Sequence, residues 1–320
     1  MTVADSPTRT FDQLFGAMAD NLRQVIQGKQ EAIELTLLCL VSEGHLLIED
    51  VPGVGKTSLA KALASSLAAG FGRLQFTPDL LPSDVVGVSV WNRNEGHFEF
   101  RPGPVFNSVV LADEINRASP KTQSALLEAM AERQVTVDGT TYALTPPFMV
   151  IATQNPIEHE GTYPLPESQL DRFLMRISLG YPDRAAEIDV LDTHGDHDVD
   201  VAPVVSPEEV QALAAAVRQV HVAPSLKSYL VDLAHATRRH PHLALGMSTR
   251  ATLALQRVAR ARAAASGRNY VIPDDIKSLV RPVVAHRLVV TPEAQIQGIE
   301  PPDALADAMS SVPVPTASQL

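Results

Sequence analysis

The chain has 320 residues, of which 45% are hydrophobic and 20% charged, a composition typical of a globular protein with one large or two modest domains. Its formal net charge of −11 argues against sequence-independent binding of nucleic acid, which requires an excess of Lys and Arg. The single cysteine, Cys39, excludes a disulfide within the chain, and we expect it to be a buried apolar side chain in a reducing cytoplasm. We expect no secretory signal and no membrane span, because the start lacks an apolar stretch and the run 35–41 is too short to cross a bilayer.

The first elements lead to a glycine-rich loop. After an N-terminus that we expect to be flexible (residues 1–10), apolar residues at helical spacing predict helices within residues 11–45. The apolar run Leu46–Glu49 predicts a strand and leads directly into a loop that ends in Lys56-Thr57. Glycines in such a loop let backbone N–H groups face phosphate oxygens, the lysine contacts the β- and γ-phosphates, and the threonine hydroxyl can ligate Mg²⁺. This segment predicts a nucleoside triphosphate site.

One position departs from the generic pattern G-x-x-x-x-G-K-[ST], because Asp50 stands where the pattern has its first glycine. The context still fits, since a predicted strand precedes the loop and a predicted helix, Ser58–Ala69, follows it. The positive N-terminal end of that helix also favours phosphate. A flexible turn that merely contains Gly-Lys-Thr is the weaker interpretation.

Two more continuous apolar runs, Val109–Ala112 and Phe148–Ala152, predict strands buried on both faces of a parallel sheet. Both end abruptly in polar residues, Asp113-Glu114 after the first and Asn155 after the second. Because ligands bind outside the carboxyl ends of parallel strands, we expect these ends to share one site with the glycine loop. The segments Arg73–Thr77 and Met175–Leu179 are candidates for two more strands.

The polar strand ends suit phosphoryl transfer, which mainly requires positioning and charge stabilisation. Asp113 can hold Mg²⁺ through water opposite Thr57, and Glu114 can orient and deprotonate the attacking water. Asn155 can hydrogen-bond the γ-phosphate or the water without adding charge. The alternatives are ordinary acidic residues at a strand end and a turn asparagine before Pro156.

Two segments between the predicted core strands read as protruding β-hairpins. Ser89–Arg101 alternates about a turn at 94–96, and Gln134–Leu144 turns at Asp138-Gly139.

Two arginines are candidates for anion contacts. Arg172 lies just before the last predicted strand, and an arginine presented to a neighbour's γ-phosphate accelerates hydrolysis by about 10³–10⁵. The alternative for Arg172 is a surface ion pair with Asp171 or Glu167. Arg250 lies in the first turn of a predicted helix, where a cation is unfavourable, which suggests a bound anion.

The C-terminal part is predicted to be helical after an acidic linker, residues 183–205. A lid domain of residues 206–290 begins with a capping box, Ser206 and Glu209. The tail 291–320 carries five prolines, and we expect it to be mobile. The predicted lid helices are Val210–Val220, Ser225–Arg238, Thr249–Ala265 and Pro273–Val280.

Several segments together resemble the MoxR-type AAA+ ATPases, over about residues 11–290. The resemblance implies a P-loop α/β core (11–182) with a five-stranded parallel sheet flanked by helices, two hairpin insertions and a C-terminal helical lid. The matching segments are EDVPGVGKTSLAKALA, FTPDLLPSDVVG, VVLADEINRASPKTQSALLEAMAERQVTVDG, ATQNPIEHEGTYPLPESQLDRFLM, ATRRHPHLALGMSTRA and GRNYVIPDDIKSLVRPVVAHR.

The resemblance also implies residue roles. The loop 53–57 corresponds to Walker A, Asp113 and Glu114 to Walker B, and Asn155 to sensor 1. Arg172 resembles an arginine finger that acts on the adjacent subunit, Arg250 resembles sensor 2, and Arg117 is a second interface candidate. The nucleotide contacts so predicted are Ile26, Gly28, Pro52, Gly53, Val54, Gly55, Lys56, Thr57, Ser58 and Arg250, with Thr57 and Asp113 at the metal.

The implied function is an ATPase that uses ATP and Mg²⁺ in a homo-oligomeric ring, typically a hexamer. Family members are thought to remodel or activate protein complexes, often by inserting cofactors or metals, together with von Willebrand factor A domain proteins. We keep two alternatives: a nucleotide-gated scaffold without productive hydrolysis, and a DNA-associated motor, which the acidic composition disfavours.

Overall fold

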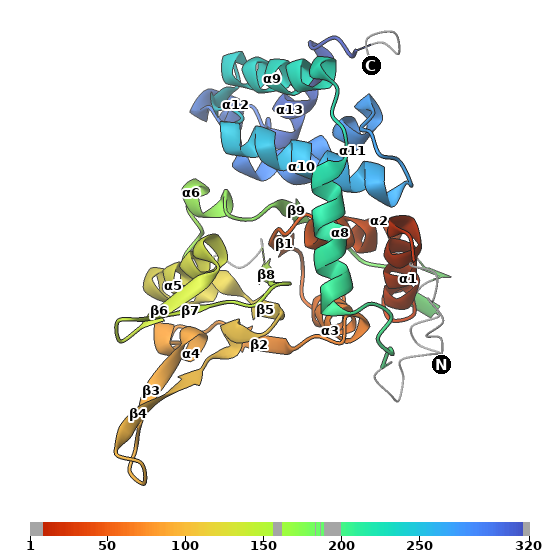
Figure 1. Ribbon diagram of the computed structural model, residues 1–320. Coiled ribbons are helices and arrows are strands. Elements are labelled where there is room, and N and C mark those ends of the chain that lie inside the picture. Colours follow the sequence, from red (N-terminus) through yellow and green to blue (C-terminus); the bar gives the residue numbers. More distant parts are fainter. Residues whose placement is uncertain (1–8, 156–161, 183, 186, 189–199, 316–320) are drawn as a thin grey trace, which may run out of the picture.

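The computed structural model describes residues 9–155, 162–182, 184–185, 187–188 and 200–315. They form an α/β core with a helical domain on one side and hairpins that extend away from it (Figure 1). The predicted flexible N-terminus and acidic linker lie largely outside the described residues. No helix in these ranges combines the length and the apolar composition that crossing a bilayer requires.

The core is built on one sheet of five parallel strands in the order β2-β5-β8-β1-β9. The predicted parallel sheet is therefore confirmed, and each strand lies within two residues of its predicted bounds. The strands are β1 (Leu46–Glu49), β2 (Phe71–Gln75), β5 (Val109–Asp113), β8 (Met149–Gln154) and β9 (Met175–Ile177).

The central strands are continuous apolar runs because both faces of the sheet are covered. Leu46 and Ile48 face one hydrophobic cluster, whereas Leu47 between them faces the other, as the twofold periodicity of a strand requires. The first cluster contains residues of α1 (Phe11–Arg23), α2 (Gln30–Val41) and α3 (Lys56–Ser66). The second contains residues of α4 (Pro82–Val86) and α5 (Pro120–Glu132). Cys39 is fully buried in the first cluster, as predicted.

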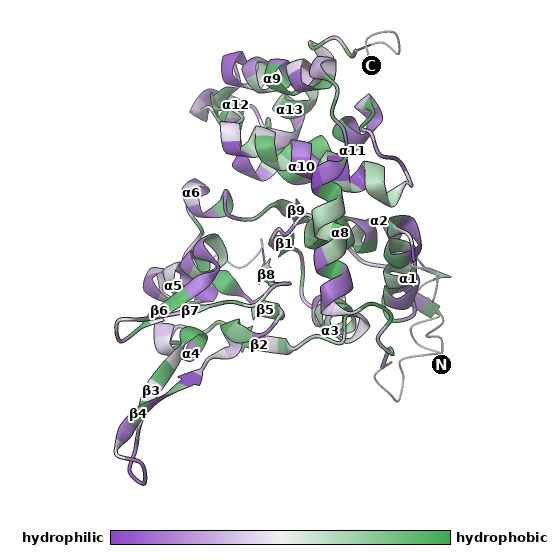
Figure 2. Cartoon of the chain, in the orientation of Figure 1, coloured by the Kyte–Doolittle hydropathy of each residue, from purple (hydrophilic) through white to green (hydrophobic). Residues whose placement is uncertain are grey.

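Both hairpins are confirmed. The first pairs β3 (Gly87–Asn92) with β4 (His97–Pro102), and the second pairs β6 (Gln134–Val137) with β7 (Thr140–Ala143). Figure 2 shows hydrophilic residues at the tip of the first hairpin, which extends furthest from the core. Asp138 and Gly139 both have positive φ, as a two-residue hairpin turn of this kind requires.

An aromatic stack joins the two hairpins. The rings of Phe100 on β4 and Tyr142 on β7 lie 4.1 Å apart at 18°, and Phe106 of η1 (Pro104–Phe106) packs edge-on against Phe100 at 5.5 Å. Phe106 in turn lies against the second hydrophobic cluster. The insertions are therefore anchored to the sheet through packed rings, each pair of which contributes about 0.5–1.5 kcal/mol beyond burial.

The helical lid begins as predicted, with a capping box between Ser206 and Glu209. Its apolar residues are continuous with the first hydrophobic cluster of the core, so the lid packs directly on α1 and α2. The elements are α8 (Pro207–Gln219), α9 (Pro224–Arg239), β10 (Leu243–Leu245), α10 (Thr249–Ala265), α11 (Pro273–Val284), η3 (Ala285–Arg287) and β11 (Val289–Val290).

The expectation that the tail 291–320 is mobile is wrong for residues 292–310. This segment forms α12 (Pro292–Ile296) and α13 (Pro301–Ser310), and α13 packs against α9. Three of the five prolines that suggested mobility, Pro292, Pro301 and Pro302, stand in the first turns of these helices, where their fixed φ favours helix formation. One face of α13 is buried, and it carries Ala304, Leu305 and Ala308.

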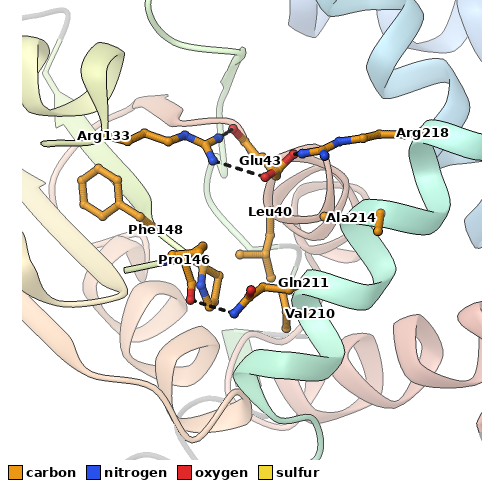
Figure 3. Close-up of a pocket in the computed structure, with 11 residues that line it drawn as sticks. Leu40, Glu43, Arg133, Pro146, Phe148, Val210, Gln211, Ala214 and Arg218 are labelled. Carbon is orange, nitrogen blue, oxygen red and sulfur yellow. Dashed lines mark hydrogen bonds and ion pairs between the residues drawn. The ribbon is translucent and has the colours of Figure 1, made fainter. Parts of the chain in front are cut away.

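Glu43, just after α2, joins the core to the lid. Its carboxylate lies between Arg133, at the end of α5, and Arg218 on α8 (Figure 3). Gln211 Nε2 on α8 also donates to Pro146 O at 2.9 Å, across a cavity of about 210 Å³. These contacts fix α8 against the loop that precedes β8.

His45, between α2 and β1, is a buried histidine that bridges two elements of the core. Val150 N–H donates to His45 Nδ1 at 3.0 Å, so the proton of the neutral ring lies on Nε2, which donates to Met130 O at 3.1 Å. Burial lowers the pKa of His45 to about 4. The folded chain therefore keeps this ring neutral at pH values where the unfolded chain protonates it.

Acidification should therefore destabilise the fold through His45. Between pH 7 and pH 5 the unfolded chain takes up a proton that the folded chain does not, which lowers the free energy of unfolding by about 2 kcal/mol. His45→Gln should make this pH dependence shallower in urea unfolding, whereas His97→Gln, at an exposed hairpin histidine, should leave it unchanged. An equally steep dependence in His45→Gln would contradict this account.

Candidate nucleotide-binding site

The carboxyl ends of three strands meet at one cavity of about 400 Å³. The glycine loop follows β1, Asp113 ends β5 and Glu114 follows it, and Asn155 follows β8. The structure thus brings together the side chains that were expected to share a site. The residues that line the cavity are Pro52, Gly53, Gly55, Lys56, Thr57, Ser58, Arg73, Asp113, Glu114 and Asn155.

The loop exposes backbone to the cavity because of its glycines. Gly53 has φ +83° and Gly55 has φ +92°, a left-handed conformation that side chains with a Cβ rarely adopt. Gly55 is the N-cap of α3, so the positive end of that helix opens into the cavity. The Val54 side chain points instead into the first hydrophobic cluster, so Val54 offers the cavity only its backbone.

Lys56 spans the loop. Its Nζ donates to Asp50 O at 2.8 Å and to Val51 O at 3.3 Å, which holds the ammonium over the turn that the glycines form. The cation lines the same cavity as Thr57, whose hydroxyl follows it in the first turn of α3.

Asp50 fastens the start of the loop to the edge strand. Its Oδ2 accepts from Ser178 Oγ at 2.9 Å, from Leu179 N–H at 2.7 Å and from Gly180 N–H at 2.6 Å, and its Oδ1 accepts from Val51 N–H at 2.9 Å. Burial alone would raise the pKa of Asp50, but these hydrogen bonds outweigh it and hold the pKa below its usual value. They also explain why β9 ends at Ile177 instead of 179, since the next N–H groups bind a carboxylate.

One threonine hydroxyl orients both acids. Thr153 Oγ1 donates to Asp113 Oδ1 at 2.7 Å and accepts from Glu114 N–H at 2.9 Å. Glu114 has φ +56°, a left-handed conformation that costs a non-glycine residue about 1–2 kcal/mol. The Thr153 bond helps to hold this backbone, which turns the Glu114 carboxylate toward the cavity and β2.

Sequence reasoning missed Arg73 and Gln75 as site residues. Arg73 Nη2 lies 2.8 Å from Asp113 Oδ2, and Gln75 Nε2 donates to Glu114 Oε2 at 2.8 Å. Both side chains are on the exposed face of β2, whose Gln75 pairs in register with Asp113. The sequence shows that Arg73 and Gln75 lie on the same face of a strand, but it does not show that this strand, β2, lies next to β5 in the sheet.

The loop after Glu114 is also anchored. Arg117, at the end of η2 (Ile115–Arg117), lies with its Nε 3.2 Å from Glu114 Oε2, so it contacts the acid of its own chain. The buried amide of Gln123 on α5 donates to Ile115 O at 3.1 Å and to Ala118 O at 3.2 Å. These bonds keep the acidic strand end in a fixed position.

The donor set fits Mg-ATP. A hydroxyl and a carboxylate, from Thr57 and Asp113, are oxygen ligands of the kind that Mg²⁺ takes together with substrate phosphates. Lys56 and the left-handed loop glycines provide the cation and the exposed backbone that a triphosphate requires.

The two residues predicted near adenine, Ile26 and Gly28, have different surroundings. The Ile26 Cδ1 atom is 3.4 Å from the position that a Cβ on Gly55 would take, so Ile26 packs directly on the glycine loop. Gly28 lines a second cavity of about 430 Å³, together with Ser178 and Leu179, the residues that bind Asp50. The structure therefore places this segment beside the loop.

Arg172 and Arg250 do not line the cavity that contains Lys56 and the two acids. They line another cavity, of about 270 Å³, at the contact of core and lid. Arg172 Nη1 donates to Leu127 O at 2.8 Å, and Arg250 Nη1 lies 3.4 Å from Asp171 Oδ2. Asp171 therefore supplies an anion to Arg250 within the chain, so the charge of Arg250 in a first turn does not by itself require a ligand.

The fold and the cavity define a P-loop ATPase of the AAA class. A family model described as "ATPase family associated with various cellular activities (AAA)" matches residues 45–175, and one described as "AAA lid domain" matches residues 235–308. The second match includes α12 and most of α13, so the ordered part of the tail belongs to the matched lid domain.

Three similar proteins place the chain more narrowly. It is 50% identical to YeaC of Bacillus subtilis (94% of this chain, 95% of that protein) and 39% identical to Chaperone MoxR1 of Mycobacterium tuberculosis (92% and 80%). The crystal structure of a candidate ATPase from Cytophaga hutchinsonii superposes with a TM-score of 0.90 at 39% identity and 96% coverage of both chains. The chain belongs to the MoxR-type family of AAA+ ATPases.

The Asp50 contacts can be tested by Asp50→Asn. The amide cannot accept all of the N–H and O–H bonds that the carboxylate accepts, so the variant should lose about 1–3 kcal/mol of unfolding free energy in urea. Asp232→Asn, at an exposed position on α9, is the matched control and should change little. Equal stability of the two variants would show that Asp50 does not fasten the loop.

Proposed function

We propose that the protein is a Mg²⁺-dependent ATPase that hydrolyses ATP at the interfaces of a homo-oligomeric ring, as a remodeller or activator of protein complexes. The observation that carries this proposal is the single cavity that gathers the glycine loop, Lys56, Thr57, the two acids and Asn155. The family to which the chain belongs supports the same activity.

Each residue has a role that its position supports. The loop N–H groups and Lys56 bind the phosphates, while Asn155 is placed at the end of β8 to hydrogen-bond the γ-phosphate or the attacking water. Glu114 orients that water and accepts its proton. Thr57 and, through water, Asp113 would hold Mg²⁺, which would supply positive charge against the charge that develops on the phosphates.

The adenine base is proposed to lie beside Ile26 and Gly28. Ile26 offers an apolar surface against the glycine loop, and Gly28 lines the neighbouring cavity. Planar bases are commonly held by such apolar contacts, while the polar groups of the site fix the phosphates.

The site is proposed to be completed by a second subunit. Arg172 and Arg250 share a cavity that Lys56 and Asp113 do not line. Within one chain, the two arginines are therefore separate from the predicted phosphate-binding site. A heterologous, head-to-tail contact presents one subunit's arginines to the next subunit's nucleotide and closes into a ring. A hexamer is the ring size that the family resemblance implies.

The remodelling role rests on resemblance and on the hairpins. Chaperone MoxR1 is named as a chaperone, and we propose a comparable role here, with a von Willebrand factor A domain protein as a partner. The first hairpin supports this role because Trp91 and Phe98 are 50% and 67% exposed and pack edge-on, with their ring centres 5.1 Å apart. Exposed aromatic pairs of this kind are typical of protein contact sites.

Glu114→Gln should separate binding from turnover. The neutral amide cannot accept a proton, so phosphate release should fall by about 10²-fold or more while ATP affinity stays within about twofold of the wild type. The measurement is steady-state phosphate release together with fluorescent-nucleotide titration, and Glu99→Gln on an exposed hairpin strand is the control.

Wild-type turnover per subunit should also rise with protein concentration, because Arg172 acts from a neighbour. Undiminished phosphate release in Glu114→Gln would remove Glu114 from its role. No release by the wild type at any concentration would favour the nucleotide-gated scaffold.

A further inference from the structure

A buried arginine of the lid, Arg287, contacts the segment that carries Arg172. The side chain of Arg287, at the end of η3, is 4% exposed, whereas Arg172 is an exposed residue of the core. Removing a guanidinium from water costs several kcal/mol unless its donors are satisfied. The partners of those donors therefore indicate what the buried charge does.

The donors of Arg287 meet the residues on both sides of Arg172. Nη2 donates to Phe173 O at 2.8 Å and to Asp171 O at 3.4 Å, while Nε forms an ion pair with Asp171 Oδ1 at 2.9 Å without the alignment of a hydrogen bond. Nη1 donates to Val283 O at 2.8 Å, which ties the guanidinium to the preceding helix, α11. The planar fork thus holds both neighbours of Arg172 against the lid.

A second lid residue strengthens this contact. His286 Nε2 lies 3.1 Å from Phe173 O. Burial lowers the pKa of His286 well below its usual value, so the ring is neutral and its Nε2–H donates to that carbonyl. Phe173 O therefore accepts hydrogen bonds from two consecutive residues of the lid.

The Arg172 guanidinium donates to Leu127 O on α5 at 2.8 Å, while the backbone around Arg172 is held through its two neighbours. The preceding helix α6 (Glu167–Leu170) has four residues, none of them buried. Phe173 is fully buried in the second hydrophobic cluster and fixes the other side. Because the Arg172 Cα lies between these two peptides, contacts with them set the direction in which its long side chain leaves the backbone.

We propose that Arg287 is a positioning residue for the ATPase reaction, which fixes from the lid the direction in which Arg172 reaches the neighbouring subunit's nucleotide. The inference rests on the proposed function, in which Arg172 acts across the interface. In this account Arg287 contacts no nucleotide, because it lines one cavity whereas Lys56 and the two acids line another. Its effect on turnover passes through Arg172.

The variant Arg287→Lys keeps the positive charge but loses the planar arrangement of donors, since one ammonium cannot contact Phe173 O, Asp171 and Val283 O in the same geometry. Misplacing Arg172 by about 1 Å should lower kcat by about 10- to 100-fold. The affinity of the same subunit for fluorescent ATP should stay unchanged. The double variant Arg172→Ala/Arg287→Lys should be no slower than Arg172→Ala alone, because a residue that acts only through Arg172 has nothing left to position.

The matched control is Arg268→Lys. Arg268 makes a bidentate ion pair with Asp275 in the same lid, at 2.6 and 2.8 Å, and also donates to Tyr270 O at 3.0 Å. This variant should keep wild-type turnover even though it loses a comparable fork, so it separates damage to the lid from loss of positioning.

Mixed rings locate the defect. A Glu114→Gln subunit has an intact Arg172, and an Arg287→Lys subunit has an intact phosphate site. In randomly mixed rings, about one site in four combines an Arg287→Lys subunit with a Glu114→Gln neighbour that supplies Arg172. Mixing the two impaired proteins should therefore restore up to about one quarter of wild-type turnover. Mixing Arg287→Lys with Arg172→Ala should restore nothing, because every subunit then lacks a correctly placed arginine.

The outcomes separate this inference from the function on which it rests. If Glu114→Gln mixed with Arg172→Ala restores no activity, the action of Arg172 across subunits is refuted. If that mixture is active but Glu114→Gln with Arg287→Lys is not, or if Arg287→Lys turns over normally, the positioning role is overturned. Should Arg287→Lys fail to fold, Asp171→Asn removes the same ion pair from the core side, together with the longer contact to Arg250 at 3.4 Å. It is tested in the same mixtures with the same expectations, because both arginines are proposed to act on the neighbouring subunit.

Discussion

The parallel register of β5, β8 and β1 is the constraint on which the site depends. These strands are adjacent and run in one direction, so the chain leaves all three at the same edge of the sheet. Glu49 pairs with Gln154, and Ala112 pairs with Ala152, which aligns the glycine loop, the two acids and Asn155 around one cavity. The apolar runs that build the core therefore also position the polar residues that follow them.

The edge strand β9 connects this cavity to the lid. On its carboxyl side, Ser178 and the next two residues bind Asp50 at the start of the glycine loop. On its amino side, Asp171 and Phe173 are held by Arg287. The strand is three residues long, so the phosphate loop and the exposed Arg172 are joined by a short, hydrogen-bonded path. Asp50, which stands where the generic pattern has its first glycine, makes the hydrogen bonds on the carboxyl side of β9.

The sequence could predict what depends on neighbours in the chain. The strands, the hairpin turn at Asp138 and the polar strand ends are local features, and the structure shows them within two residues of the predicted bounds. It could not predict Arg73 beside Asp113, because that contact depends on the order of strands in the sheet. The same holds for Arg287 and Asp171, which are 116 residues apart. The tail was mistaken for a mobile segment because prolines that begin helices were counted as signs of disorder.

The central claim is that the cavity at the sheet edge binds the phosphates of Mg-ATP. Calorimetric titration of the wild type and of Lys56→Ala with ATP, with and without Mg²⁺, tests it most directly. The account predicts saturable, Mg²⁺-strengthened binding by the wild type and a loss of that binding in Lys56→Ala, with unchanged thermal unfolding. No binding heat in the folded wild type, or equal affinity in Lys56→Ala, would contradict it.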